Sequence, residues 1–162
     1  EQILCFGRME ERFSTGIYGM EYSSFWVSIK PLALMVPTAR HRNVKNAIDS
    51  QSGIAEQYAI NTYFSYFEEL GLVGGIIRIN DEIKAVTIGE KLNSNTFCTH
   101  IEKADTSYQG IYVGINNEFA KHAAYGCEYI NREEDLGLEG LRRSKMSYYP
   151  EFLLEKHVIT FK

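Results

Sequence analysis

The sequence predicts one domain of mixed α+β structure, with a central mixed sheet flanked by helices. Its 162 residues fit a single domain of ordinary size. It is 44% hydrophobic and 13% aromatic, which is enough apolar material for a packed core and excludes global disorder. From residue 55 on, segments with helical spacing alternate with short runs rich in Ile and Val, the pattern of a domain that mixes helices and strands.

The first well-defined element is a helix predicted over residues 55–70, ending at Gly71, with one apolar face made of Ala59, Tyr63, Phe67 and Leu70. A β-hairpin follows. Two runs rich in Ile and Val, residues 75–79 and 83–89, flank the pair Asn80-Asp81, and both of these residues tolerate a positive φ. Residues 95–101 predict the next strand, because they combine β-branched and aromatic side chains.

The second half of the domain predicts two further helices and the closing strands. Residues 108–125 form a helix with an apolar stripe of Ile111, Ile115 and Phe119. A short strand over 128–131 comes next, and Asp135 stands at the N-cap position of a helix over 136–146. One or two closing strands are expected within residues 152–161.

Residues 1–54 are less regular and are treated as an N-terminal segment separate from a domain over residues 55–162. Residues 9–12 suit a short helix, and residues 25–29 suit a strand that stops at Pro31. The charges also divide at this boundary: the first 54 residues hold six Lys and Arg against five Asp and Glu, and the rest hold eleven against sixteen. The first residue is Glu, so the chain is expected to be a piece of something longer.

Composition excludes several classes of function. The net charge of −4 and the pI near 5.6 exclude a protein that depends on non-specific nucleic-acid binding. No apolar run is long enough for a transmembrane helix, and no segment has the layout of a signal peptide, so a cytoplasmic protein without stable membrane insertion is expected.

The cysteines and histidines predict neither a disulfide framework nor a metal site. Three widely spaced cysteines, with no CxxC pair, are typical of neither a secreted scaffold nor a structural zinc site. Cys98 and Cys127 are expected to be small core residues rather than nucleophiles. His41, His122 and His157 have no spacing that indicates a metal, so no metal is expected.

Two polar clusters at strand ends are the candidate site. Residues 131–135 follow a short strand, where they either line a site or favour the start of a helix through its dipole. His100 and Glu102 fall on the same face of a strand by alternation, and they form either a general-base pair or, with Lys103, part of a surface ion-pair set.

A third group is cationic: Arg142, Arg143 and Lys145 bind a phosphate or an RNA backbone, or simply complement a helix C-terminus. No phosphate-binding loop, HExxH or GxSxG motif is present.

The order of several longer motifs resembles a known family. IGEKLN, HIEKA, INNEFA, INREEDLG, GLRRSK and LLEK follow one another within residues 55–160, roughly two-thirds of the chain. They resemble bacterial proteins, first grouped as of unknown function, that are classed with the C-terminal domain of phosphatidylglycerol lysyltransferase. The resemblance implies a GNAT-type acyltransferase fold, usually present as two units in tandem. It makes residues 96–101 the central strand, 108–125 the helix after it and 127–131 the next strand.

Two departures from the family pattern bear on the donor and on chain organisation. Residues 1–54 do not resemble the upstream family sequence, so the chain resembles the C-terminal half of a tandem. The acyl-CoA pyrophosphate loop of ordinary GNAT enzymes, [QR]xxGx[GA], is missing, since Gly110 and Gly114 have the wrong spacing. The resemblance therefore favours an aminoacyl-tRNA type donor over acyl-CoA, although an acidic chain is a poor RNA binder and both donors stay open.

The function implied is a GNAT-like acyl or aminoacyl transferase domain. An amine or hydroxyl of the acceptor attacks a donor carbonyl held against the central strand. His100 and Glu102 are the base candidates, Asn131 and Arg132 orient or polarise, and Lys145 meets phosphate or developing negative charge. The other expected substrate-binding residues are Lys103, Glu133, Asp135 and Arg142.

This reading expects both clusters to border one cleft, with Glu102→Gln and Arg132→Ala abolishing transfer at little cost in stability. The alternative is a non-catalytic half that packs against another GNAT-like unit or forms a homodimer.

Overall fold

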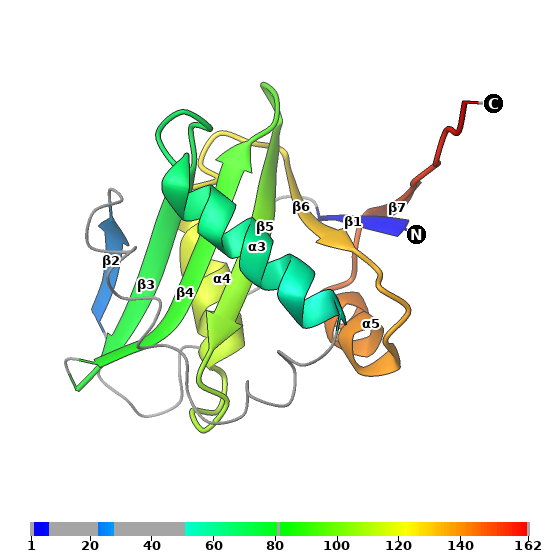
Figure 1. Cartoon of the computed structure of the whole chain (residues 1–162). Coiled ribbons are helices and arrows are strands. Elements are labelled where there is room, and N and C mark those ends of the chain that lie inside the picture. Colours follow the sequence, from blue (N-terminus) through cyan, green and yellow to red (C-terminus); the bar gives the residue numbers. More distant parts are fainter. Residues whose placement is uncertain (1, 7–22, 28–50, 81, 162) are drawn as a thin grey trace.

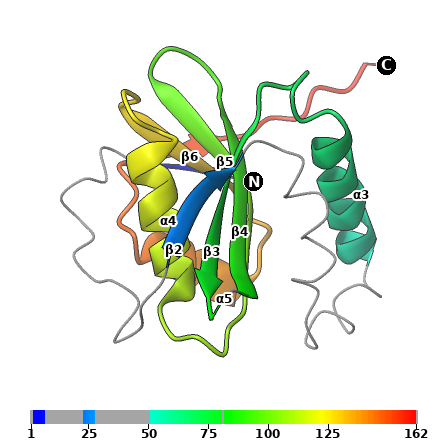
Figure 2. The same ribbon diagram turned by 90° about the vertical axis from the view of Figure 1, so that its left-hand side faces the viewer.

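Among the described residues, the sheet is a middle layer with helix α3 on one face and helix α4 on the other (Figure 1, Figure 2). The computed structural model describes residues 2–6, 23–27, 51–80 and 82–161. Figure 1 shows helix α3 crossing one face of the sheet, and the turned view in Figure 2 places α4 on the opposite face. The helices within these described ranges are α3 (Gln51–Ser65), α4 (Ile111–His122) and α5 (Glu139–Met146).

The part of the chain that the structure describes forms a seven-stranded sheet in the order β2-β3-β4-β5-β6-β1-β7. Its strands are β1 (Gln2–Phe6), β2 (Ser23–Val27), β3 (Val73–Ile79), β4 (Glu82–Lys91), β5 (Thr96–Ala104), β6 (Tyr129–Glu134) and β7 (Phe152–Glu155). All neighbouring pairs are antiparallel except β5 and β6, which are parallel. The predicted mixed sheet is confirmed, and this one parallel pair sets β5 and β6 apart from the rest.

The predicted hairpin is confirmed in its register. β3 pairs with β4 from Val73↔Gly89 to Ile79↔Glu82, and Asn80 adopts a φ of 52° at the turn. An Asn in this left-handed region costs less than most residues, because its short polar side chain can bond locally. Turn chemistry therefore supports the same pairing as the β-branched runs on either side.

Two cores fill the two faces of the sheet. On the α3 face, buried apolar side chains from the helix, the turn after it and three strands pack together: Ile60, Phe67, Leu72, Ile76, Val86, Ile88 and Ile101.

On the α4 face, the predicted stripe of Ile111, Ile115 and Phe119 is confirmed, each being at most 2% exposed. Ile77, Ile79 and Ala85 meet the first two residues of that stripe, while Phe97, Cys127 and Ile130 pack with Phe119.

The stripe predicted for the first helix is only partly right. Phe67 is buried, but Leu70 is 44% exposed, and Ile60 joins the core in its place. The helix ends at Ser65, and residues 66–71 form turns that close at Gly71 with a φ of 64°. Leu70 lies beyond the end of the helix, so the helical spacing that predicted its burial does not apply to it.

The C-terminal region differs from its prediction in two places. Helix α5 begins at Glu139 with Leu138 as N-cap, so Asp135 is not the cap. Instead the Asp135 carboxylate accepts a hydrogen bond from the Gly137 N–H at 2.9 Å. The closing strand covers only Phe152–Glu155, since residues 156–161 have no regular structure. Cys127, expected in a strand, lies just before β6 and is buried in the core.

The N-terminal part contributes two strands to the same sheet. β2 pairs antiparallel with β3, close to the strand predicted over 25–29, and β1, which was not predicted, lies between β6 and β7. The helix predicted over residues 9–12 lies outside the described residues. The boundary at residue 54 stays a prediction. Within the described ranges, no helix has the length and apolar character needed to cross a membrane.

Gly89 provides a test of the packing between the sheet and α4. A Cβ at this position would meet the carbonyl oxygen of Cys98 and lie 2.7 Å from Phe97 Cε1 and 3.1 Å from Phe119 Cε1. We expect Gly89→Ala to lower the free energy of unfolding by about 1–3 kcal/mol, because neither a backbone oxygen nor two buried rings can move aside freely. Chemical denaturation measures this.

Gly140→Ala is the matched control for Gly89→Ala. An added Cβ at Gly140 meets nothing within 4 Å. Because Ala is a better helix former than Gly, this change is expected to be neutral or to stabilise by up to about 1 kcal/mol. Equal effects of the two substitutions would contradict the packing described for Gly89.

Candidate functional site

The site begins where the parallel strands β5 and β6 part. They pair only at Thr96↔Tyr129, Phe97↔Ile130 and Cys98↔Asn131. Beyond these residues β6 turns toward β1, with which it pairs up to Glu134, while β5 continues beside β4 (Figure 1). The carboxyl-terminal residues of both strands therefore surround the point of separation, where polar side chains in α/β sheets commonly gather.

Backbone irregularities occur in both strands at this point. The β4–β5 register changes from Ile88↔Ile101 to Gly89↔Thr99, which leaves His100 as the extra residue of a β-bulge. In β6, Glu133 has a φ of 52°, and its N–H donates to Asn131 Oδ1 at 2.7 Å. A non-glycine residue in this region is strained, and such strain is concentrated at functional sites.

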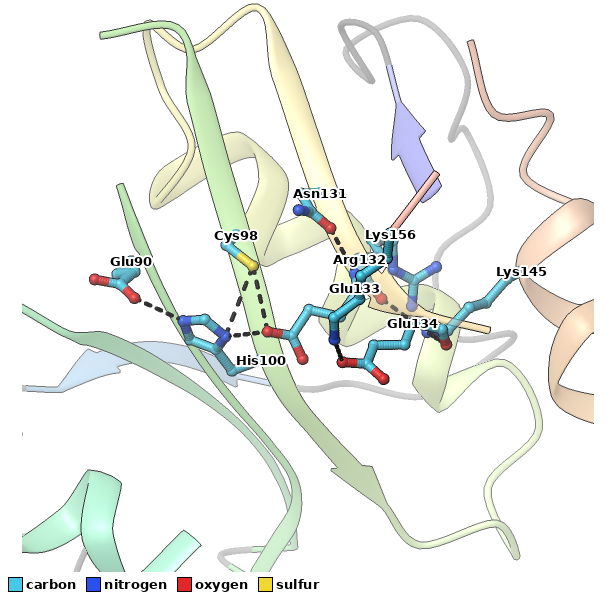
Figure 3. A network of polar contacts seen from close by, with 9 residues as sticks. All are labelled: Glu90, Cys98, His100, Asn131, Arg132, Glu133, Glu134, Lys145 and Lys156. Atoms are coloured by element: carbon cyan, nitrogen blue, oxygen red, sulfur yellow. Dashed lines mark hydrogen bonds and ion pairs between the residues drawn. The ribbon is translucent and has the colours of Figure 1, made fainter. Parts of the chain in front are cut away.

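A polar cluster lies on the α3 face at these two irregular residues. His100 Nδ1 lies 2.5 Å from Glu133 Oε1, and His100 Nε2 lies 2.9 Å from Glu90 Oε1 (Figure 3). Cys98 Sγ lies 3.6 Å from both His100 Nδ1 and Glu133 Oε1. Tyr63 of α3 stacks on the imidazole with ring centroids 5.2 Å apart. We call Cys98, His100, Glu133 and Glu90 the His100 cluster.

The electrostatics of this cluster favour a charged imidazole. Burial of the ring acts to lower the pKa of His100, but its contacts with Cys98, Glu133 and Glu90 outweigh burial and raise the pKa to about 11. Burial raises the pKa of the Cys98 thiol. These contacts therefore favour the protonated form of the imidazole.

A second polar cluster lies on the α4 face. Arg132 Nη2 donates to Glu102 Oε2, and Asn116 of α4 donates to Glu102 Oε1 at 2.9 Å. The Arg132 guanidinium also lies 4.5 Å from the centroid of the Tyr148 ring. The side chains of Arg132 and Glu102 are only 8% and 12% exposed. Burial acts against the charge of Arg132, but Glu102 outweighs it and raises the pKa of Arg132.

The prediction that His100 and Glu102 share a face is wrong. His100 stacks on α3, whereas Glu102 bonds to α4, on the other side of the sheet. The bulge at His100 interrupts the alternation on which the prediction relied. The neighbouring residues Arg132 and Glu133 also lie on opposite faces of the sheet, since Arg132 contacts Glu102 and Glu133 contacts His100. The two polar clusters therefore do not border one shared surface.

The remaining predicted residues hold local structure together. Lys145 Nζ donates to the backbone carbonyls of Arg132 at 2.8 Å and Glu134 at 3.0 Å, and burial lowers its pKa. This ties α5 to the end of β6. Lys103 pairs with Glu56 of α3 at 2.6 Å, and Arg142 pairs with Asp135 at 2.6 Å.

Several residues of the site were missed from the sequence. Cys98 was not predicted to belong to the site. It stands two residues before His100 in the same strand, a spacing that places both side chains on one face, so the sequence did contain a signal for it. Glu90 and Tyr63 carry no such signal, because pairing with β4 and packing of α3 bring them to His100.

A sequence profile described as phosphatidylglycerol lysyltransferase, C-terminal, matches residues 39–160. The chain belongs to this family. The match starts before α3 and runs through β7, so it includes both polar clusters. No curated protein sequence matches the chain.

Solved structures extend the comparison. A conserved protein of unknown function from Bacteroides thetaiotaomicron VPI-5482 is 33% identical, with a TM-score of 0.83 over 94% of this chain and 57% of that chain. The C-terminal domain of a protein described as a lysylphosphatidylglycerol synthetase, from Agrobacterium fabrum, is 9% identical, with a TM-score of 0.56 over 93% of this chain and 56% of that chain. The present chain thus spans just over half the length of each.

The fold is that of the GNAT acetyltransferases. Aminoglycoside N-acetyltransferase AAC(6')-Iy, in complex with CoA, is 8% identical, with a TM-score of 0.56 over 89% of this chain and 96% of that chain. An identity this low shows the fold alone. The predicted fold class and family resemblance are both confirmed.

The burial of the Arg132–Glu102 pair leads to a prediction opposite to the one made from the sequence. We expect Arg132→Ala or Glu102→Ala to lower the free energy of unfolding by about 3–5 kcal/mol, because each leaves an uncompensated charge in a buried site. Thermal and chemical denaturation measure this. Arg143→Ala is the control, since it breaks an exposed pair with Glu139 and should cost less than about 1 kcal/mol. Unchanged stability in Arg132→Ala would contradict a structural role.

Proposed function

We propose that this chain is a transferase domain that holds an acyl or aminoacyl donor where β5 and β6 part. The observation that carries the proposal is the early end of the parallel pairing, which leaves the β6 side of β5 without a partner strand, among the described strands, from residue 99 on. A strand edge of this kind offers backbone N–H groups to a donor carbonyl, where they stabilise the oxyanion that forms during attack.

The proposed reaction is direct transfer. A nitrogen or oxygen atom of the acceptor forms a bond to the donor carbonyl carbon, the bond to the donor's leaving group breaks, and the leaving group takes up the acceptor's proton. The protein's main contribution is to hold the two reactants in line. His100, Asn131 and Glu133 line the point of separation on the α3 face in this proposal. Glu102 and Arg132 are positioning residues that brace the strands from the α4 face.

The start of α4 is the proposed place for the donor's phosphates. The helix follows β5 directly, its N-cap Gly110 has a φ of 83° with no side-chain cap, and its first turn contains no acidic residue. Free N–H groups and the positive end of the dipole at a helix start suit an anion. Acyl-CoA and aminoacyl-tRNA both carry phosphates, and the missing pyrophosphate loop favours the aminoacyl donor.

Gly110 offers an isosteric pair of variants to test this placement. Asn and Asp both tolerate a positive φ, and a Cβ at Gly110 meets nothing within 4 Å. We expect Gly110→Asp to weaken binding of acetyl-CoA, or of aminoacylated tRNA, about fivefold relative to Gly110→Asn, since like charges about 4 Å apart repel by about 1 kcal/mol in water. Calorimetric titration with each probe measures the effect. Equal affinities of the two variants for both probes, or no binding of either by the parent chain, would contradict the proposal.

A second candidate function is packing against another GNAT-like unit, including a second copy of this chain. β7 is the last strand of the sheet, and the side chains of its Phe152, Leu153 and Leu154 are 38–44% exposed. The segment after it exposes Val158 at 84%, Ile159 at 79% and Phe161 at 96%. An apolar edge of this kind favours association.

Light scattering tests the second candidate. We expect the chain to have a mass above that of the monomer, and we expect the double variant Val158→Asp, Phe161→Asp to return it to the monomer. Tyr125→Asp is the control. Tyr125 is also 81% exposed, but it belongs to the turn that connects α4 to β6 and not to β7 or the segment after it. A monomeric parent chain at high concentration would argue against self-association through this edge.

A further inference from the structure

The His100 cluster contains three different potential metal ligands that point toward one another. Cys98 Sγ, His100 Nδ1 and Glu133 Oε1 all lie within 4.8 Å of one another (Figure 3). Sulfur, imidazole nitrogen and carboxylate oxygen are the ligand atoms that bind Zn²⁺ in proteins. The soft thiolate selects against Mg²⁺ and Ca²⁺, which prefer oxygen alone.

We propose that Cys98, His100 and Glu133 form a binding site for a zinc ion, with Glu90 as its outer-shell partner. The site shares His100 and Glu133 with the lining proposed for the transfer reaction, but zinc binding does not require that reaction to occur. It departs from the sequence-based expectation of no metal, because its third ligand lies on another strand, far along the chain from the other two.

The distances within the cluster suit a tetrahedral ion. Ligand atoms held about 2.0–2.3 Å from Zn²⁺ lie about 3.3–3.8 Å apart in a tetrahedron. The separations of Cys98 Sγ from His100 Nδ1 and from Glu133 Oε1 are both 3.6 Å, within this range. The His100 Nδ1 to Glu133 Oε1 distance of 2.5 Å has to widen by less than about 1 Å on metal binding.

Glu90 occupies the place of an outer-shell carboxylate. It accepts a hydrogen bond from His100 Nε2 at 2.9 Å, while Nδ1 faces the two other ligands. Metal-binding histidines usually donate their second ring N–H to a carboxylate or carbonyl, which fixes the tautomer and the ring orientation. The stacked Tyr63 ring further restricts the imidazole.

The exposed fractions of the cluster side chains indicate how an ion enters the site. They also argue against Cys98 as a nucleophile. Cys98 is 2% exposed, so a substrate carbonyl has little access to its sulfur. The Glu133 and Glu90 side chains are 38% and 32% exposed, which leaves a route for an ion from their side. Three protein ligands also leave the fourth position of a tetrahedral ion open, as in catalytic zinc sites.

Metal binding by the full chain tests the proposal. After chelator treatment and incubation with Zn²⁺, we expect one equivalent of zinc by elemental mass spectrometry. With Co²⁺ we expect a thiolate-to-cobalt charge-transfer band that is lost in Cys98→Ser and retained in Cys127→Ser, which changes another buried cysteine. Absence of bound zinc, or a band that persists in Cys98→Ser, would overturn the proposal.

The carboxylate ligand provides a comparison that does not depend on a core substitution. Competition with a chromophoric chelator should show Glu133→Gln binding Zn²⁺ at least tenfold more weakly than Glu134→Gln, whose carboxylate pairs with Lys156 instead. Glu90→Gln should weaken binding about 10–100-fold, the range for outer-shell partners. If Cys98→Ser does not fold, the comparison of Glu133→Gln with Glu134→Gln tests the zinc site on its own. Equal zinc affinities of these two variants would overturn the proposal.

Discussion

The early end of the parallel pairing between β5 and β6 is the constraint on which the rest of the site depends. After Cys98↔Asn131 the two strands no longer support each other through a backbone ladder. Side chains link them instead, with His100 bonded to Glu133 on one face of the sheet and Glu102 to Arg132 on the other. Two polar links across parted strands thus take the place of regular hydrogen bonding.

The two links differ in burial, and this separates their roles. Arg132 and Glu102 lie among β5, β6, α4 and Tyr148, where an unpaired charge is costly, so this link holds the strands at their separation. Glu133 and Glu90 reach solvent beside the buried His100 and Cys98. The α3 face therefore combines a buried, hydrogen-bonded interior with a partly exposed edge, through which an ion or a substrate can reach the cluster.

The backbone of the His100 cluster is irregular in both strands. A bulge leaves His100 facing α3 while Glu102 faces α4. In β6, Glu133 has a positive φ, which costs on the order of 1–3 kcal/mol, and its carboxylate contacts His100. Such features persist only where surrounding packing imposes them. Here the β4 ladder, the Lys145 bonds to the carbonyls on either side of Glu133, and the Asn131 side chain supply that support.

The sequence by itself determined several of the elements and the neighbourhood of the site. Periodicity and turn chemistry were sufficient to predict the β3–β4 hairpin and the Ile111–Ile115–Phe119 stripe, because the spacing of apolar residues along a segment shows which face is buried. They also placed polar clusters near strand ends, at residues 100–103 and 131–135. Only the tertiary structure decided which side chains meet. One extra residue in β5 reversed the face of His100 relative to Glu102, and register with β4 and β6 brought Glu90 and Glu133 to it. The position of a bulge and the register of a strand depend on the partner strands, so they cannot be predicted from the spacing of residues within one strand.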